Sequence, residues 1–342
     1  MKRVVTFGEI MLRLKAPGHE RLFQSPALEA VFGGGEANVA VSLATFGAQA
    51  VFVSALSKDS VGQAAIRNLR GYGVDVGRIR QTGARTGIYF LEAGADQRPS
   101  QVVYDRAGSA AALMQPGDFP WAEIFRGADW FHFTGITPAL SASAAQACLE
   151  AVQAARAAGV TVSIDLNYRK KLWNYGVKAT EVMTGLAGLA DVLIANEEDI
   201  QLALGIQAEA PAAGGAVDTG AYQALAAAAR ARFPGLRIVA ITLRESFSAD
   251  RNQWSAVLDG REGFRRSRPY PLEDIVDRVG GGDAFAAGLI FGLLEFGEEG
   301  RALEFAVAAS ALKHTIPGDF NLARREEVEQ LAAGEGSGRV QR

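Results

Sequence analysis

The sequence predicts an α/β protein with a central, mostly parallel sheet and a small second sheet. Short continuous apolar runs alternate with helical patterns along most of the chain, which is typical of strands buried on both faces of a parallel sheet. Two glycine triplets each open a helical pattern. A pair of extended segments between residues 87 and 105 interrupts the alternation, which indicates a small sheet of its own.

The totals favour an ordinary globular protein. The 342 residues suffice for one large α/β domain with a small attached element. Hydrophobic residues make up 49% and charged residues 21%, and the net charge of −3 argues against a protein that binds nucleic acid electrostatically. No apolar run has the length of a membrane span.

The amino-terminal stretch and the single cysteine indicate the cellular compartment in which we expect the protein. The stretch MKRVVTFGEIMLRL mixes acidic and basic residues, so we expect a first strand there and no signal peptide. Cys148 lies in a predicted helix and has no partner for an internal disulfide, so we interpret it as a core residue of a cytoplasmic protein.

The first strand, residues 4–7, ends at Gly8 and is not followed by a GxGxxG fingerprint, which disfavours a nucleotide-dependent oxidoreductase. No GxxxxGK[ST] motif occurs either. Further strands are expected at 51–55, 129–133, 160–165, 191–195 and 237–243, a hairpin at 254–258 and 263–266, and helices at 36–46, 60–71, 141–158, 200–204, 221–233, 283–296 and 301–314. Residues 207–220 are predicted to be a surface insertion, and 334–342 a polar tail.

The extended pair at 87–92 and 101–105 is joined by a polar turn. Such an excursion from an α/β pattern suggests a lid over a site. Tyr89, Tyr104 and Arg106 lie on it, although aromatic residues in strands more often serve packing.

The first glycine triplet, Gly33–Gly35, is followed by Asn38 in the first turn of a predicted helix. Glycine allows a ligand to approach the backbone closely, so Asn38 would face that ligand. A plain loop with a solvated asparagine explains the pattern equally well.

The second triplet is the centre of DRVGGGDAF, residues 277–285. Free N–H groups at a helix start attract an anion, and Asp283 beside them could bind a cation or accept a proton. Phosphoryl transfer needs both an anion cradle and a group that orients the nucleophile. The alternative is a flexible turn with a capping aspartate.

Two strand ends carry further candidates, because ligands of open parallel sheets bind at the carboxyl ends of strands. Arg169 follows the strand at 160–165, and an acidic cluster, Asn196–Asp199, follows the next strand. The cluster fits a metal held through water or the capped first turn of a helix. The three histidines are scattered without metal-ligand spacing.

Taken together, these motifs resemble the ribokinase-like (PfkB) family of sugar kinases over nearly the whole chain. DRVGGGDAF resembles the family's second signature, and GGGEANVA resembles its sugar-binding Gly–Gly…Asn element. Further stretches resemble a subgroup that phosphorylates 2-keto-3-deoxygluconate: YDRAGSAA, GITPALS, SIDLNYRKKLW, NEED, ITLRES, HTIPGDFNLA and GSGRVQR.

The resemblance implies a three-layer αβα sandwich formed by a single domain at 1–330, with lid strands at about 11–32 and 86–106 and a tail at 331–342. It implies phosphorylation of the sugar acid on carbon six by ATP, with Asp283 as general base and the N–H groups of Gly280, Gly281 and Gly282 as anion hole. The implied sugar-binding residues are Gly34, Gly35, Asn38, Tyr89, Tyr104, Arg106, Arg169 and Asp319. The implied ATP-binding residues are Asn167, Asn196, Thr242 and Arg244, with Mg²⁺ near Asp199.

For two of these residues, a physical argument also supports binding of a sugar acid. The guanidinium groups of Arg106 and Arg169 suit a carboxylate, which a neutral hexose lacks. The resemblance also implies a homodimer through the lid and leaves room for a monovalent cation. The alternatives are another sugar kinase of the family, such as a fructokinase, or a sugar-acid sensor without catalysis, which would have no need of Asp283.

Three positions depart from the family pattern. Gly281 replaces the alanine of GAGD, which predicts a more flexible loop. Asp199 replaces a glutamate, which shortens the carboxylate that faces the metal. LRESFSADRN, from Leu243, replaces a glycine-containing nucleotide loop, so the ATP contacts are expected to differ there.

Overall fold

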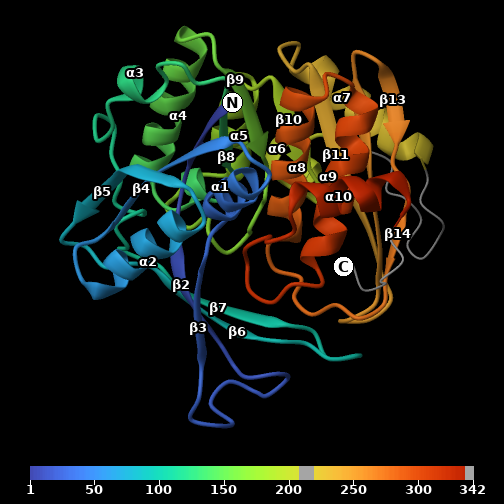
Figure 1. Cartoon of the computed structure of the whole chain (residues 1–342). Coiled ribbons are helices and arrows are strands. Elements are labelled where there is room, and N and C mark those ends of the chain that lie inside the picture. The colour runs from blue at the N-terminus through green and yellow to red at the C-terminus, as the bar shows by residue number, and fades with distance from the viewer. Residues whose placement is uncertain (208–218, 336–342) are drawn as a thin grey trace.

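A computed structural model describes residues 1–207 and 219–335 (Figure 1). Ten strands form the central sheet in the order β13-β12-β11-β10-β9-β8-β1-β4-β5, and β14 pairs with β12. They are β1 (Arg3–Phe7), β4 (Gln49–Ser57), β5 (Asp75–Thr82), β8 (Trp130–Thr134), β9 (Thr161–Asp165), β10 (Val192–Ala195), β11 (Ile238–Ser246), β12 (Asn252–Gly260), β13 (Gly263–Arg266) and β14 (Tyr270–Leu272). The sheet is parallel from β11 to β5, as predicted.

Helices cover both faces of this sheet. One hydrophobic cluster joins it to α1 (Gly35–Thr45), α2 (Ser60–Gly71), α8 (Gly281–Glu295), α9 (Glu299–Lys313) and α10 (Arg325–Ala333). The other joins it to α3 (Trp121–Ile124), α4 (Ala142–Ala157), α5 (Ala179–Ala187), α6 (Glu197–Leu204) and α7 (Thr219–Arg232). A short 3₁₀ helix, η1 (Thr137–Ala139), precedes α4. The three-layer αβα sandwich is therefore confirmed.

Neighbouring side chains of β1 show why the strands read as continuous apolar runs. Val4 belongs to one hydrophobic cluster and Val5 to the other, and both are fully buried. A strand that is covered on both faces needs apolar side chains at successive positions. Cys148 is buried in α4 within the second cluster, as expected of a core residue.

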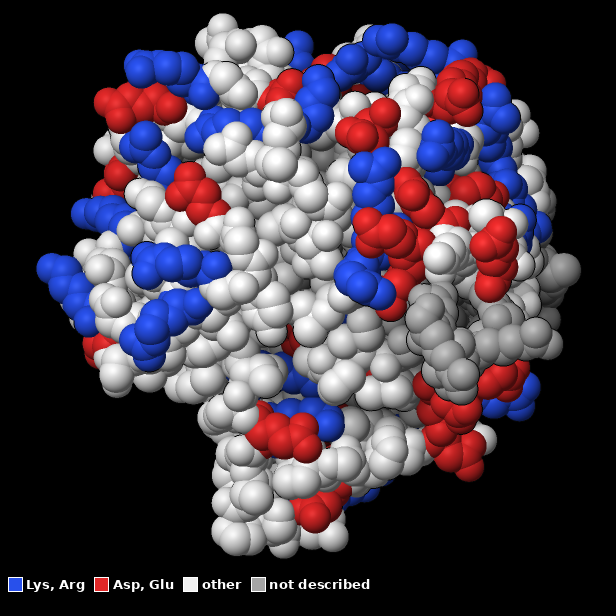
Figure 2. Space-filling model, viewed as in Figure 1, with Lys and Arg blue, Asp and Glu red and all other residues white. Residues whose placement is uncertain are grey.

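Four strands form the small sheet, in the order β3-β2-β6-β7. They are β2 (Met11–Lys15), β3 (Glu29–Gly33), β6 (Ile88–Glu92) and β7 (Gln101–Asp105). The sheet projects below the main body (Figures 1 and 2). β3 ends at Gly33 and α1 begins at Gly35, so the first glycine triplet joins the small sheet to a helix that covers the central sheet.

The structure also contains elements that the sequence pattern did not predict, namely β5, β14, α3, α5 and α10. The helix α10 continues to Ala333, into the expected tail at 331–342. Residues 336–342 of that tail and residues 208–218 of the expected insertion at 207–220 lie outside the described residues. Within the described ranges, no helix is long and apolar enough to cross a membrane.

Candidate active site

A cavity of about 780 Å³ lies between the small sheet and the carboxyl ends of the central strands. Every residue that the sequence assigned to the site lines it, except Gly281. The lining comes from distant parts of the chain, including β6, the loop after β9, the start of α6 and the start of α8. The fold therefore brings the two glycine triplets and the strand-end residues to one place.

Asp283 lies buried in the first turn of α8. Its Oδ2 accepts a hydrogen bond of 2.7 Å from Nδ2 of Asn38, whose Oδ1 accepts one of 3.2 Å from the N–H of Gly34. Burial raises the pKa of Asp283 to about 7, the Asn38 hydrogen bond opposes this rise, and the charges of Asp319 and Glu36 add to it. The carboxylate is thus poised to accept a proton near neutral pH.

The start of α1 is anchored by the buried carboxylate of Glu36. Its Oε1 accepts hydrogen bonds from the backbone N–H and the hydroxyl of Thr134, at 3.0 and 2.8 Å, and from the hydroxyl of Thr137 at 2.8 Å. These bonds fix the helix turn that carries Asn38. The amide of Asn38 is accordingly held between the first glycine triplet and Asp283.

The glycine loop before α8 packs against residues at the end of α9. Gly280 has φ 85°, a conformation that strongly favours glycine. A Cβ on Gly281 would lie 2.6 Å from Cε1 of His314, so the imidazole fills the space that the family's alanine would use. The hydroxyl of Ser310 donates to the carbonyl of Gly281 at 2.7 Å. The loop is therefore supported at Gly281 by His314 and Ser310, and the more flexible loop expected from Gly281 stays a prediction.

The three N–H groups of the expected anion hole differ in their surroundings. That of Gly281 donates to the carbonyl of Arg278 at 3.3 Å, and Gly281 does not line the cavity. Gly280 and Gly282 do line it, and a Cβ on Gly282 would meet no atom within 4 Å. The open approach to the backbone is therefore at Gly282.

The small sheet contributes an aromatic and a cationic group. The hydroxyl of Tyr89 donates to the carboxylate of Asp319, at 2.6 and 2.7 Å from its two oxygens. The guanidinium of Arg106 lies 4.2 Å from the ring centre of Tyr104, and its Nε is 3.5 Å from Oε2 of Glu9. Nη1 of Arg106 is buried and has no hydrogen-bond partner among the described residues. An anion from the cavity would satisfy it.

The end of β9 carries a buried carboxyl group that the sequence analysis did not single out. Burial raises the pKa of Asp165 well above its ordinary value, the charges of Asp199 and Asp283 add to the rise, and Arg169 opposes it. Asn167 follows with φ 36° and a buried Oδ1 that has no partner among the described residues. The position of Asp165, the last residue of a predicted strand, was the available signal.

The acidic cluster after β10 contains the N-cap residue of α6, Asn196, and a carboxylate that lines the cavity, that of Asp199. Oδ1 of Asn196 accepts a hydrogen bond of 2.7 Å from the N–H of Asp199 and thereby caps α6. Burial raises the pKa of Asp199 to about 6, although the nearby Arg169 opposes the rise. In the described part of the chain, no group of three or more His, Cys, Asp or Glu is arranged to hold a metal ion.

Thr242 and Arg244 lie on β11 at the far end of the cavity. The hydroxyl of Thr242 donates to the carbonyl of Ala195 at 3.4 Å. The stretch LRESFSADRN comprises the end of β11 and the turn that leads to β12, where the N–H of Ala249 donates to the carbonyl of Asp96 in the loop between β6 and β7 at 2.8 Å. The β11–β12 hairpin thus contacts the loop that joins two strands of the small sheet.

Besides Asp165, the lining contains further charged residues that the sequence did not assign to the site, among them Glu9 and Arg278. Arg278 lies two residues before Gly280, and Glu9 lies two residues after the end of the first strand. Both positions agree with the rule that ligands bind at the carboxyl ends of strands and at glycine loops.

Comparison with known proteins agrees with this geometry. Residues 1–322 match the pfkB family carbohydrate kinase description. The crystal structure of a 2-dehydro-3-deoxygluconokinase from Thermotoga maritima is similar with a TM-score of 0.92 and 47% identity, over 97% of this chain and 98% of that one.

Two curated proteins are similar over nearly their whole length. A 2-dehydro-3-deoxygalactonokinase from Haloferax volcanii is 33% identical over 98% of each chain. A 2-dehydro-3-deoxygluconokinase from Bacillus subtilis is 30% identical over 97% of this chain and 95% of its own.

Proposed function

Because the chain belongs to the pfkB family of carbohydrate kinases, we propose that it transfers the γ-phosphoryl group of ATP to the 6-hydroxyl group of 2-keto-3-deoxygluconate. The observation that carries the substrate class is the buried, unpartnered Nη1 of Arg106 in the cavity. A buried guanidinium needs an acceptor, and the carboxylate of a sugar acid supplies one. Arg169, which also lines the cavity, provides a second cation.

Asp283 acts as the general base. As the 6-oxygen attacks the γ-phosphorus, its proton passes to the Asp283 carboxylate and ADP leaves. Asn38 holds Oδ2 of Asp283 through one hydrogen bond, which leaves Oδ1 for the hydroxyl group. The N–H of Gly282, together with the positive end of α8, stabilises the charge that develops on the phosphoryl oxygens.

The carboxyl groups of Asp165 and Asp199 fit a divalent cation. Each is buried, and the charge of Asp199 raises the pKa of Asp165, a repulsion that a cation between them would relieve. Bound Mg²⁺ supplies charge neutralisation for the phosphates of ATP. Asn167, Asn196, Thr242 and Arg244 line the same end of the cavity, and we assign them to ATP.

The relatives suggest a second candidate, the galactonate epimer, which differs from the gluconate in its configuration at carbon four. The Thermotoga structure is named for the gluconate and the Haloferax protein for the galactonate. We favour the gluconate because the identity to the former is 47%.

An ADP-release assay tests the substrate class. The purified protein is given ATP with both keto-deoxy acids, fructose and ribose, and we expect at least one acid to exceed both neutral sugars clearly in kcat/KM. Arg106→Gln should raise KM for the acid by about 10²-fold, while KM for a neutral sugar changes little, because a charge-assisted bond is lost. Faster turnover of a neutral sugar would reject the proposal.

Three further expectations stay predictions. They are the homodimer through the small sheet, the cytoplasmic location inferred from the low cysteine usage, and the involvement of a monovalent cation. Size-exclusion chromatography with light scattering tests the first, and fractionation of the producing cells the second. The third is connected with a buried lysine beneath the glycine loop.

A further inference from the structure

Lys313 is the last residue of α9, and its side chain is fully buried. Its Nζ donates to two backbone carbonyls, that of Asp277 at 3.3 Å and that of Ile316 at 3.0 Å. Burying an ammonium group destabilises the folded protein unless polar partners compensate for the lost hydration. A buried lysine at this place therefore calls for an explanation.

The ammonium group lies under the loop that forms the anion hole. A Cβ on Gly280 would lie 3.3 Å from Cε of Lys313, and one on Gly281 would meet His314. Two consecutive residues thus support two consecutive glycines. The bond from Lys313 to the carbonyl of Asp277 fixes the residue at which this loop begins.

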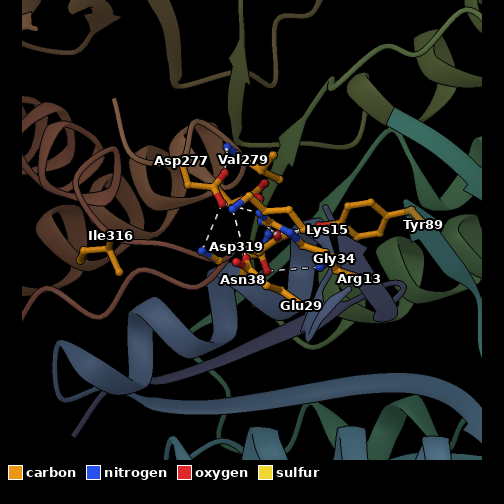
Figure 3. Close-up of polar contacts among 12 residues, drawn as sticks. Arg13, Lys15, Glu29, Gly34, Asn38, Tyr89, Asp277, Val279, Ile316 and Asp319 are labelled. Carbon is orange, nitrogen blue, oxygen red and sulfur yellow. Dashed lines mark hydrogen bonds and ion pairs between the residues drawn. The ribbon is translucent and has the colours of Figure 1, made fainter. Parts of the chain in front are cut away.

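A second buried cation holds the same loop from the small sheet. Arg13, on β2, donates from Nη1 to Oδ1 of Asp319 at 2.6 Å and from Nη2 to Oδ2 of Asp277. Figure 3 shows both carboxylates directed at the guanidinium group. Asp277 also accepts hydrogen bonds from the N–H groups of Val279 and Gly318, each at 3.1 Å.

The charges of this cluster balance. Lys313 and Arg13 are cations, and Asp277 and Asp319 are anions within their reach. Removal of the ammonium group would take this donor from the carbonyls of Asp277 and Ile316 and leave the cluster with an excess negative charge beside Asp283. Both effects oppose the approach of a negatively charged phosphoryl group.

Carbonyl oxygens that converge on one point suit a monovalent cation as well as an ammonium group. We propose that Lys313 is a positioning residue whose ammonium group acts as a built-in cation: it holds residues 277–280 in the shape that directs the N–H of Gly282 at the phosphoryl group. The kinase accordingly needs no external monovalent cation. The inference rests on the proposed phosphoryl transfer at this loop, and not on which sugar accepts the group.

The test compares Lys313→Ala with Lys313→Met, using whichever sugar the wild-type protein phosphorylates best. We expect both variants to lose about 10²-fold in kcat, since loss of one anion-hole donor costs this much, with KM for the sugar within about threefold. The kcat of Lys313→Ala should be at least about tenfold higher in potassium, ammonium or propylammonium chloride than in choline chloride. Lys313→Met should not recover, because its side chain fills the space.

Lys58→Ala serves as control, because Lys58 is exposed and lies outside the cavity; its kcat should equal that of the wild type. Wild-type kcat should be the same in potassium and choline chloride, and a requirement for potassium would overturn the proposal without any variant. A folded Lys313→Ala protein with unchanged kcat, or with a loss that no cation restores, would overturn it too. A preference for neutral sugars would reject only the proposed substrate and leave this comparison intact.

Discussion

Replacing Asp283 by Asn should have opposite effects on catalysis and on stability. The substitution keeps the size of the side chain and its contact with Asn38, whose Nδ2 lies 2.7 Å from Oδ2 of Asp283. It removes the proton acceptor, and it also removes a carboxylate that is buried in the cavity wall. The first loss lowers turnover, whereas the second relieves the native state of a poorly solvated charge.

Each of the two effects has an expected magnitude. General-base assistance is worth about 10²–10⁴-fold in rate, so kcat should fall by that factor while KM for the sugar changes little. The pKa of Asp283 rises from 3.8 in the unfolded chain to about 7 in the folded protein. The folded state therefore binds the proton more tightly, and wild-type stability decreases as pH rises through this window, by about 4 kcal/mol in total.

Asp283→Asn does not take part in this titration. Its free energy of unfolding should match that of the wild type near pH 4 and exceed it increasingly up to pH 7, with a constant difference of about 4 kcal/mol above that. The wild-type kcat should decrease about tenfold per pH unit below 7, because protonated Asp283 cannot accept a proton.

Urea unfolding of both proteins at several pH values between 4 and 8, together with the ADP-release assay, measures both effects. Asp274→Asn is the matched control, because Asp274 is exposed and lies outside the cavity; neither quantity should change. Near-normal turnover of Asp283→Asn would refute the assignment of the base. A wild type and a variant whose stabilities run parallel across this pH range would refute the buried-charge argument.

The remaining predictions concern residues that pack against the cavity or bind within it. Gly281→Ala should destabilise the protein by about 1–3 kcal/mol, because its Cβ would lie 2.6 Å from His314; adding His314→Ala should return most of this, as thermal unfolding of the double variant would show. Asp199→Asn should raise the Mg²⁺ concentration for half-maximal turnover and leave KM for the sugar unchanged; an unaltered Mg²⁺ titration would contradict its role. Tyr89→Phe removes both hydrogen bonds to Asp319 and should cost about 1–3 kcal/mol in unfolding free energy; an unchanged urea midpoint would count against it.

The sequence predicted the part of the fold that buries apolar strands on both faces. β1 and β9 read as continuous apolar runs because helices cover the sheet on either side. β5, in contrast, is an edge strand with the sequence DVGRIRQT and no fully buried residue. Its pattern does not separate it from a loop, and for this reason the prediction omitted it.

Candidate site residues could be assigned from sequence where they lie next to a recognisable local feature, such as a glycine triplet or a strand end. Asp283 and Asn38 each follow a glycine triplet, and Arg169 follows a strand end, so short patterns sufficed to assign them. The same patterns did not show that Asn196 caps α6, because a cap and a metal ligand look alike in sequence. Only the position of the helix start, at Glu197, distinguishes them.

The cluster beneath the glycine loop had no local signal at all. Arg13 lies 264 residues from Asp277 and 306 from Asp319, so no pattern in a short window relates them. Lys313 falls in the last turn of α9, where a basic residue is already explained by the helix dipole. Because the helix dipole already accounts for a lysine at this position, the sequence did not indicate that its side chain is buried. The burial of Lys313 depends on how α9 and the loop at Asp277 pack together. In DRVGGGDAF, consequently, the glycines and Asp283 could be interpreted from sequence, whereas the role of Asp277 emerges only once its two cationic partners are known.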